Sequence, residues 1–179
     1  MKKTVGVVGN GFVGESQAFG FSPTTDVKIY DINPLKSTHT LDDVLKQEFI
    51  FICLPTPMKE NGEQDLSFIK NFFDGITNKT ESIFIIKSTV LPGTTKARII
   101  IGGEDNLVLR VKSLFDERFM NRNIILTDST TAEFVKYMNN TYFAAKISLM
   151  NEYYRLSQSL DVDWETAKFG FVSDGRIAD

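Results

Sequence analysis

Cysteine and histidine, two residue types that often carry chemistry, are nearly absent from this sequence, and proline is scarce. Its 179 residues include one cysteine, one histidine and five prolines. A single cysteine excludes an internal disulfide framework and a cysteine-cluster metal site, so we expect no metal. The histidine, His39, stands in the polar stretch Lys36-Ser37-Thr38-His39-Thr40. A lone histidine in such a loop is more often a surface residue than a catalytic base, and we assign it no chemistry.

An excess of charge of either sign and a long apolar run are also missing. Lysine and arginine number 20 against 23 aspartates and glutamates, which gives a net charge of −3. No basic surplus favours nucleic acid or an anionic membrane. The longest strongly apolar run, residues 49–54, is far shorter than a membrane span, and Gly9-Asn10-Gly11 interrupts any signal-peptide core. We therefore expect a cytoplasmic protein with no nucleic-acid or membrane partner.

A glycine-rich motif at the start of the chain is the most informative feature that is present. Residues 4–14 read TVGVVGNGFVG, a short apolar strand that runs into G-x-G-x-x-G. In this pattern Gly9 permits a tight turn, Gly11 lets the backbone approach a pyrophosphate, and Gly14 lets the following helix pack close to the strand. The helix begins around Phe12 and Val13, and its N-terminus presents free N–H groups to the phosphates.

An acidic residue at the end of the next expected strand completes the pattern. Asp31 closes the stretch DVKIYD, at residues 26–31. Its carboxylate can accept hydrogen bonds from a ribose 2′-hydroxyl and repel a 2′-phosphate. The glycine motif alone would be weak evidence, but the strand before it and Asp31 after it predict a dinucleotide site with NAD as the cofactor.

Expected strands and helices alternate along the first part of the chain. Apolar strands that alternate with helices favour a parallel sheet covered on both faces. The expected fold class is therefore α/β, with a Rossmann-like, doubly wound parallel sheet followed by a long central α-helix. We expect strands at 4–8, 27–31, 49–54, 82–87, 98–102 and 123–127, and helices at 12–19, 41–46, 66–76 and 105–115.

The pattern changes after Ser129 to one long helix, from residue 131 to about residue 160. A stripe of apolar residues at helical spacing runs along it. We therefore divide the chain into a Rossmann-like domain at 1–128 and a central helical segment at 129–179. The N-cap candidates are Asp128, Ser129 and Thr130, and the stripe comprises Phe134, Met138, Ala145, Leu149 and Leu156.

Further motifs follow in a fixed order along the chain. They are Leu54-Pro55-Thr56-Pro57, Asp65-Leu66-Ser67, KSTVLPGTT at 87–95, AEFVKYMNNT at 132–141, ISLMNE at 147–152 and Asp161-Val162-Asp163. In this order the chain resembles the UDP-glucose/GDP-mannose dehydrogenase family. These are NAD-dependent enzymes that oxidise the C6 hydroxyl of a sugar to a carboxylate. The resemblance covers nearly the whole sequence.

The resemblance implies a cofactor site. Lys36 falls where the family often places a basic residue near the adenosine ribose, although a plain surface lysine fits equally well. The turn after the third strand would lie along the cofactor at the strand ends, and Ser88 would sit near the nicotinamide. The expected cofactor-binding residues are Gly9, Gly11, Phe12, Val13, Gly14, Asp31, Lys36, Pro55, Thr56, Pro57, Ser88 and Thr89.

The resemblance also implies three catalytic residues. Thr89 would orient a water or a substrate hydroxyl. Lys136 and Asn140, one helical turn apart, would point at the sugar C6, where an ammonium and an amide could stabilise the developing alkoxide. The alternatives are a solvated helix face for Lys136 and Asn140 and a strand-end cap for Ser88 and Thr89.

Two departures from the family pattern limit what this sequence can do alone. In the family a helix, a strand and a loop with a catalytic glutamate follow the Pro-Gly-Thr-Thr motif, whereas only Lys96 and Ala97 separate residues 92–95 from the next strand. The family also continues, after a segment like residues 174–177, into a second domain with a catalytic cysteine. Cys53 lies inside an apolar run, the usual setting of an inert buried thiol.

Three functions stay open at this point. The first is a nucleotide-sugar 6-dehydrogenase of the UDP-glucose or UDP-N-acetylhexosamine class, shortened or present as its cofactor-binding half. The second is a non-catalytic NAD-binding module or part of a split enzyme. The third is a β-hydroxyacid-type dehydrogenase, against which the motifs at 55–57 and 65–67 argue.

The expected partners are a UDP-sugar and a second copy of the chain. The apolar stripe of the long helix continues into Tyr153 and Tyr154, and it would form a large exposed patch in a monomer. The resemblance implies central helices that pair across a two-fold axis, so we expect a homodimer. The alternative is that the stripe packs only on its own domain.

Overall fold

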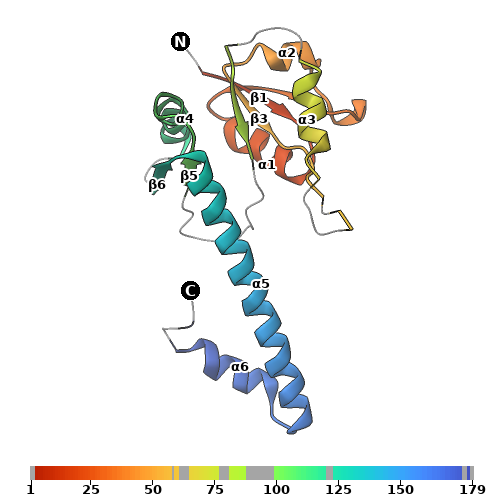
Figure 1. Cartoon of the computed structure of the whole chain (residues 1–179), viewed down its shortest axis with the longest axis vertical. Coiled ribbons are helices and arrows are strands. Elements are labelled where there is room, and N and C mark those ends of the chain that lie inside the picture. The colour runs from red at the N-terminus through yellow and green to blue at the C-terminus, as the bar shows by residue number, and fades with distance from the viewer. Residues whose placement is uncertain are drawn as a thin grey trace. The chain divides into compact units, whose positions relative to one another are not determined.

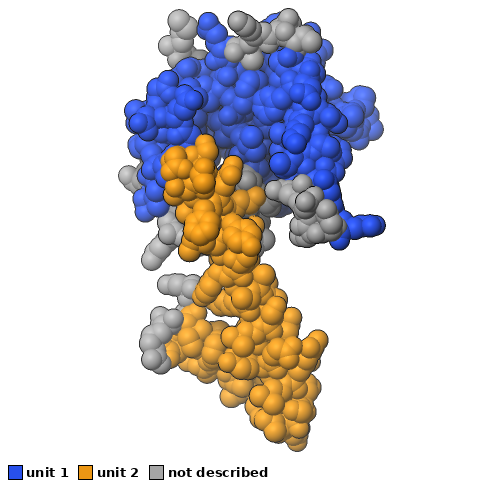
Figure 2. Space-filling model, viewed as in Figure 1, with its two compact units in different colours: residues 1–127 blue, residues 128–179 orange. Residues whose placement is uncertain are grey.

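A computed structural model of the chain describes residues 3–57, 59–60, 65–76, 81–87, 99–119, 123–174 and 177. The chain divides into two compact units, residues 1–127 (unit 1) and residues 128–179 (unit 2), which are described separately (Figure 2). Among the described residues, no helix combines the length and the apolar character that crossing a membrane requires.

Unit 1 is built on a four-stranded parallel sheet with the strand order β2-β1-β3-β4. Figure 1 labels the two central strands, β1 and β3. The register places Val5 of β1 beside Val27 of β2 and Phe49 of β3, and Phe49 beside Ile83 of β4. The central strands β1 and β3 are almost wholly buried, which explains their continuous apolar sequences. The strands are β1 (Thr4–Val8), β2 (Asp26–Tyr30), β3 (Phe49–Ile52) and β4 (Ile83–Ile86).

Helices cover both faces of this sheet, because successive strand side chains point to opposite sides. Alternate residues such as Phe49 and Phe51 pack with α1 (Phe12–Phe21) and α4 (Asp105–Arg118). The residues between them, such as Ile50, pack with α2 (Leu41–Leu45) and α3 (Ser67–Asp74). The sheet is therefore doubly wound, as the sequence predicted.

Phenylalanine rings fill the core on the α1 and α4 face. The Phe21 ring of α1 stacks 5.2 Å from the Phe51 ring of β3 and meets the Phe115 ring of α4 edge-on at 5.3 Å, centroid to centroid. A shorter pair of parallel strands, β5 (Ile99–Gly102) and β6 (Ile124–Thr127), flanks α4 in sequence. Within the described ranges, β5 and β6 pair only with each other.

Unit 2 consists of two helices, α5 (Ser129–Ser159) and α6 (Trp164–Val172). The Asp128 side chain caps α5 by accepting a hydrogen bond from the Thr131 N–H at 2.8 Å. Between the helices Asp161 adopts a left-handed conformation with φ 51°, and the Val162 N–H donates to the Ser157 carbonyl at 2.9 Å. These two features form a Schellman-type end to α5.

Several element boundaries differ from the sequence expectation, mostly by one to three residues. The first helix continues to Phe21 and the fourth to Arg118, whereas the third strand stops at Ile52. Sequence reasoning missed α6 and the short 3₁₀ helix η1 (Pro34–Lys36) altogether. Both follow a side chain that caps the helix, Asp163 and Asn33 respectively, and those capping residues were the available signal.

Candidate functional site

The carboxyl ends of the four parallel strands meet at one edge of the unit 1 sheet. Backbone hydrogen bonds extend the ladder there, because the Gly9 N–H donates to the Tyr30 carbonyl at 2.9 Å and the Cys53 N–H donates to the Val8 carbonyl at 2.8 Å. The residues that follow β1, β2 and β3 are thereby brought side by side. This edge is where open α/β sheets bind their ligands.

The three glycines of the motif meet different constraints. Gly9 has φ 88°, and a Cβ on it would lie 2.7 Å from the Cys53 carbonyl oxygen; a Cβ on Gly14 would lie 1.9 Å from the Gly9 oxygen. These two positions exclude a side chain because the chain itself approaches them. A Cβ on Gly11 would meet no atom within 4 Å, so the N-terminus of α1 opens onto free space. A dinucleotide phosphate fits this arrangement.

Asp31 follows β2 directly and is held by two backbone donors. Its Oδ2 accepts a hydrogen bond from the Asn10 N–H at 2.6 Å, and its Oδ1 accepts one from the Asn33 N–H at 2.8 Å. A carboxylate oxygen can accept two hydrogen bonds, so each still has capacity for a ligand hydroxyl. The first of these bonds joins the acidic residue directly to the glycine loop.

A hollow of about 340 Å³ lies in front of the glycine loop. Its size suits part of a dinucleotide. Among the residues expected at the cofactor, Gly11, Phe12 and Lys36 line it. Sequence reasoning missed the other three lining residues, Asn10, Glu15 and Leu35. Asn10 and Glu15 stand in or next to the glycine motif, whereas Leu35 carried no signal of its own.

Other described residues that we expected at the cofactor do not line this hollow. Val13 is half-buried, and neither it nor the Pro55-Thr56-Pro57 turn after β3 lines this hollow. Pro55 and Pro57 are exposed and Thr56 is half-buried. Ser88 and Thr89 lie outside the described residues, so their expected roles stay predictions.

Cys53 and Lys87 are cross-strand neighbours beyond the ends of β3 and β4, where the Lys87 N–H donates to the Ile52 carbonyl at 3.1 Å. Burial raises the pKa of the Cys53 thiol to about 12, and the nearby Lys87 only partly opposes this shift. Burial likewise lowers the pKa of the Lys87 ammonium. A protonated thiol is a poor nucleophile. In the described ranges no three histidine, cysteine, aspartate or glutamate side chains gather as a metal site would require.

Lys136 and Asn140 belong to unit 2, not to the unit that holds the glycine loop. Both lie on α5, where Lys136 is half-buried and Asn140 is exposed. Ser157 is the one buried residue that the structure describes along this helix. Large apolar side chains are exposed over most of its length, among them Phe134, Tyr137, Met138, Tyr142, Ile147, Leu149 and Leu156.

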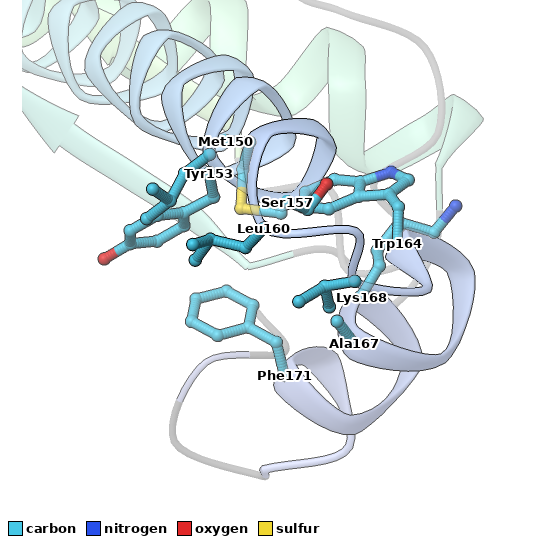
Figure 3. A pocket seen from close by; sticks show the side chains of 10 residues that line it. Met150, Tyr153, Ser157, Leu160, Trp164, Ala167, Lys168 and Phe171 are labelled. Carbon is cyan, nitrogen blue, oxygen red and sulfur yellow. The ribbon is translucent and has the colours of Figure 1, made fainter.

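An apolar hollow of about 230 Å³ lies between α5 and α6 within unit 2. Figure 3 shows Tyr153, Leu160 and Phe171 around it, with Trp164 on α6 nearby. The Tyr153 and Phe171 rings lie 6.1 Å apart and close one side. The hollow continues the apolar surface of α5 to the end of the helix.

Two protein-family models match the chain. The model described as the UDP-glucose/GDP-mannose dehydrogenase family, NAD binding domain, matches residues 34–112. The central-domain model of the same family matches residues 130–179. The first match confirms NAD, the cofactor expected from the sequence.

Individual proteins agree with these matches. The chain is 30% identical to a UDP-N-acetyl-D-mannosamine dehydrogenase from Methanocaldococcus jannaschii, over 67% of this chain and 37% of that protein. It is 28% identical to a UDP-glucose 6-dehydrogenase from Rickettsia bellii, over 80% of this chain and 42% of that protein. The chain thus spans less than half the length of both curated relatives.

Solved structures confirm the Rossmann-like α/β fold with a long central helix. A UDP-glucose dehydrogenase from Pyrobaculum islandicum superposes with a TM-score of 0.81 at 20% identity, over 99% of this chain and 58% of that chain. A UDP-D-ManNAc dehydrogenase from Pyrococcus horikoshii gives a TM-score of 0.80 at 23% identity, over 97% and 58%. At these identities the likeness is one of fold.

Proposed function

Because the chain belongs to the UDP-glucose/GDP-mannose dehydrogenase family, we propose that it supplies the NAD-binding and central parts of a nucleotide-sugar 6-dehydrogenase. The substrate would be a UDP-sugar whose C6 hydroxyl is oxidised. The observation that supports this most is the 2.6 Å hydrogen bond between the Asn10 N–H and Asp31 Oδ2, since it assembles a dinucleotide site at the carboxyl edge of a parallel sheet.

In this proposal NAD lies across the sheet edge. Gly11 and the N-terminus of α1 would hold the pyrophosphate, with Phe12 and Val13 in the first turn, while Asp31 would accept hydrogen bonds from the adenosine ribose hydroxyls and Lys36 would lie near that ribose. The turn at 55–57 and Ser88 border the rest of the cofactor. Gly9 and Gly14 give the loop its shape.

The proposed catalytic residues are Thr89, Lys136 and Asn140. Bound NAD supplies the acceptor for the hydride that leaves the sugar C6. Thr89 orients the C6 hydroxyl, and Lys136 and Asn140 stabilise the negative charge that develops on its oxygen. The spacing of Lys136 and Asn140, one turn apart on α5, supports a shared role for these two side chains.

Oxidation to the carboxylate requires a reactive thiol, and Cys53 is unsuited to that role because its pKa is raised to about 12. The purified chain should therefore bind NAD but produce no steady NADH from UDP-glucose or a UDP-N-acetylhexosamine. Calorimetry with NAD and absorbance at the NADH band would measure both. Failure to bind NAD, or sustained turnover, would contradict the proposal.

A second candidate is a non-catalytic NAD-binding module or one part of a split enzyme, and the protonated, poorly nucleophilic Cys53 thiol supports it. A trace of turnover separates the two possibilities. If the central helix carries chemistry, Lys136→Ala abolishes that trace and Cys53→Ser leaves it unchanged. The absence of any trace with the unmodified chain favours the second candidate, whereas a trace that survives Lys136→Ala contradicts the proposed role of Lys136.

We also propose that the chain forms a homodimer through α5. The exposed apolar side chains along the helix and the apolar hollow at its end support this interface. Surfaces of this extent are unusual on a soluble monomer, and two-fold pairs are the commonest oligomers.

A further inference from the structure

The turn after β2, residues 31–37, is held by hydrogen bonds although it lies at the surface. The Asn33 side chain accepts a bond from the Leu35 N–H at 3.1 Å, and the Asn10 side-chain amide donates to the Lys36 carbonyl at 2.8 Å. The Ser37 hydroxyl bonds both backbone groups of Asp31, at 2.7 and 2.8 Å. These contacts fix the conformation of the turn before any ligand arrives.

This fixed turn holds two large apolar side chains in solvent. Ile32 is 92% exposed and Leu35 is 95% exposed. Exposed apolar surface is unfavourable in water, and a rigid turn cannot fold these side chains inward. Only Leu35 of the two lines the 340 Å³ hollow, together with Phe12, which is itself 72% exposed. The hollow therefore has an apolar wall that this unit leaves uncovered.

The glycine loop and the turn at 31–37, which both contribute to the hollow, have different chemistry. Gly11 and the free N–H groups of α1 suit a phosphate, whereas Asp31 begins the turn that carries Leu35 and suits a ribose. A base is bonded directly to its ribose, so the base must lie within reach of the turn at 31–37. A purine ring offers the flat apolar face that would cover Leu35.

We infer that Leu35 is a cofactor-binding residue that packs on the adenine ring of the cofactor, and that Asn10 is a positioning residue that holds the turn at Lys36. The inference rests on the proposed NAD site. Asn10 suits the role because its amide nitrogen is committed to the Lys36 carbonyl, while its Oδ1 is buried with no hydrogen-bond partner in the described structure. A buried amide oxygen without a partner costs stability, so we attribute the buried position of this side chain to the hydrogen bond by which it holds the turn in place.

Two matched variants test the contact. Leu35→Ser and Ile32→Ser remove equally exposed apolar side chains from the same turn, so neither should disturb folding. We expect Leu35→Ser to weaken NAD and ADP-ribose by about 5- to 10-fold in calorimetry, because the adenine loses an apolar partner. Ile32→Ser should change both by less than about twofold. Equal effects of the two variants, or none from Leu35→Ser, would overturn the inference.

A measurement on the unmodified chain needs no variant. With NAD bound, nuclear Overhauser effects should connect the adenine H2 or H8 proton to the Leu35 methyl groups. Their absence at saturating NAD contradicts the contact. If the chain binds neither NAD nor ADP-ribose, the proposed function fails first; if it binds both without this contact, only the present inference fails.

The positioning role of Asn10 has its own readout. Asn10→Ala should weaken NAD several-fold, and the double variant with Leu35→Ser should lose less than the product of the two single losses. A purely structural role would give independent losses that multiply. If the losses of NAD affinity multiply in the double variant while the thermal unfolding temperature is unchanged, Asn10 has no positioning role in the adenine contact.

Discussion

At the scale of single residues, the proposed cofactor site combines polar groups that already have hydrogen-bond partners within the chain with positions that are open to a ligand. Asp31 holds two backbone N–H groups and still presents acceptor capacity, whereas Gly11 presents open space. Glu15 is an acid that lines the hollow, opposite in charge to Lys36, which lines it as well. In the proposed site the helix end would favour a pyrophosphate, and Asp31 would disfavour an additional phosphate beside it.

Replacement of Asp31 should change the choice between the two nicotinamide dinucleotides. We expect the unmodified chain to bind NAD more tightly than NADP, and Asp31→Ala to narrow that ratio by about tenfold or more, since charged hydrogen bonds to the ribose are lost and repulsion of a 2′-phosphate ends. Calorimetric titration of both cofactors would measure it. Asp26→Ala, at the other end of β2, serves as the control. Unchanged preference in Asp31→Ala would contradict the role.

The Cys53 thiol should be unreactive across the neutral range. Its pKa is raised by burial to about 12 from an ordinary value of 9.0, so the folded state prefers the protonated form. The associated stability is fully present below pH 9 and is lost as the pH rises from 9 towards 12. Iodoacetamide should therefore alkylate the folded chain at pH 8 at least about tenfold more slowly than the urea-unfolded chain. Equal rates would show an accessible thiolate.

At the scale of elements, the two helices of unit 2 begin in the same way. Asp128 caps α5 through the Thr131 N–H, and Asp163 caps α6 through the N–H groups of Glu165 and Thr166, at 3.1 and 3.3 Å. The long helix has many intrahelical bonds to sustain it. The nine-residue α6 depends much more on its cap and on its contact with α5.

Loss of the Asp163 cap should loosen α6 selectively. Hydrogen bonds from the Thr166 side chain and backbone lower the pKa of the Asp163 carboxyl, so this stabilisation is present above pH 3.8 and disappears as the pH falls through the lowered pKa. Asp163→Ala should speed amide exchange in α6 by about fivefold at pH 7. Asp163→Asn keeps an acceptor and should stay near the unmodified rate. Faster exchange throughout the chain would argue against a local role.

At the scale of the whole molecule, the apolar side chains exposed along α5 are expected to be buried against a partner surface. Tyr153 joins the side chains of this helix to the apolar hollow against α6, so one continuous surface runs along unit 2. A second copy of the chain would bury this surface symmetrically. Association would leave the hollow at the glycine loop to act separately, because that hollow is formed within unit 1.

Light scattering at micromolar concentration should give about twice the 20.2 kDa mass of one chain. Leu149→Glu combined with Tyr153→Glu should reduce the mass to that of the monomer, because each dimer would then bury several carboxylates. NAD affinity should remain within about twofold, since unit 1 is unchanged. Gln158→Glu, an exposed polar position on the same helix, controls for added charge. A monomeric mass for the unmodified chain would rule the dimer out.

The sequence by itself determined the features that depend on local pattern. The glycine motif and Asp31 indicate a dinucleotide site because each residue type has a separate steric or electrostatic task there. Strand and helix periodicity predicted the doubly wound sheet and the long helix to within a few residues. Exposure of the α5 stripe was also expected, because one helix of that length exceeds what a small domain can cover.

The tertiary structure alone decided which distant residues share the hollow at the glycine loop. In the sequence, nothing distinguishes Leu35 from other leucines in loops. In the structure, the register of β1 and β2 places its turn beside Asn10 and the glycine loop. The pairing of Cys53 with Lys87 likewise comes from the register of β3 and β4. Sequence pattern could not reveal these contacts, because they depend on how separate strands align and not on the spacing within one segment.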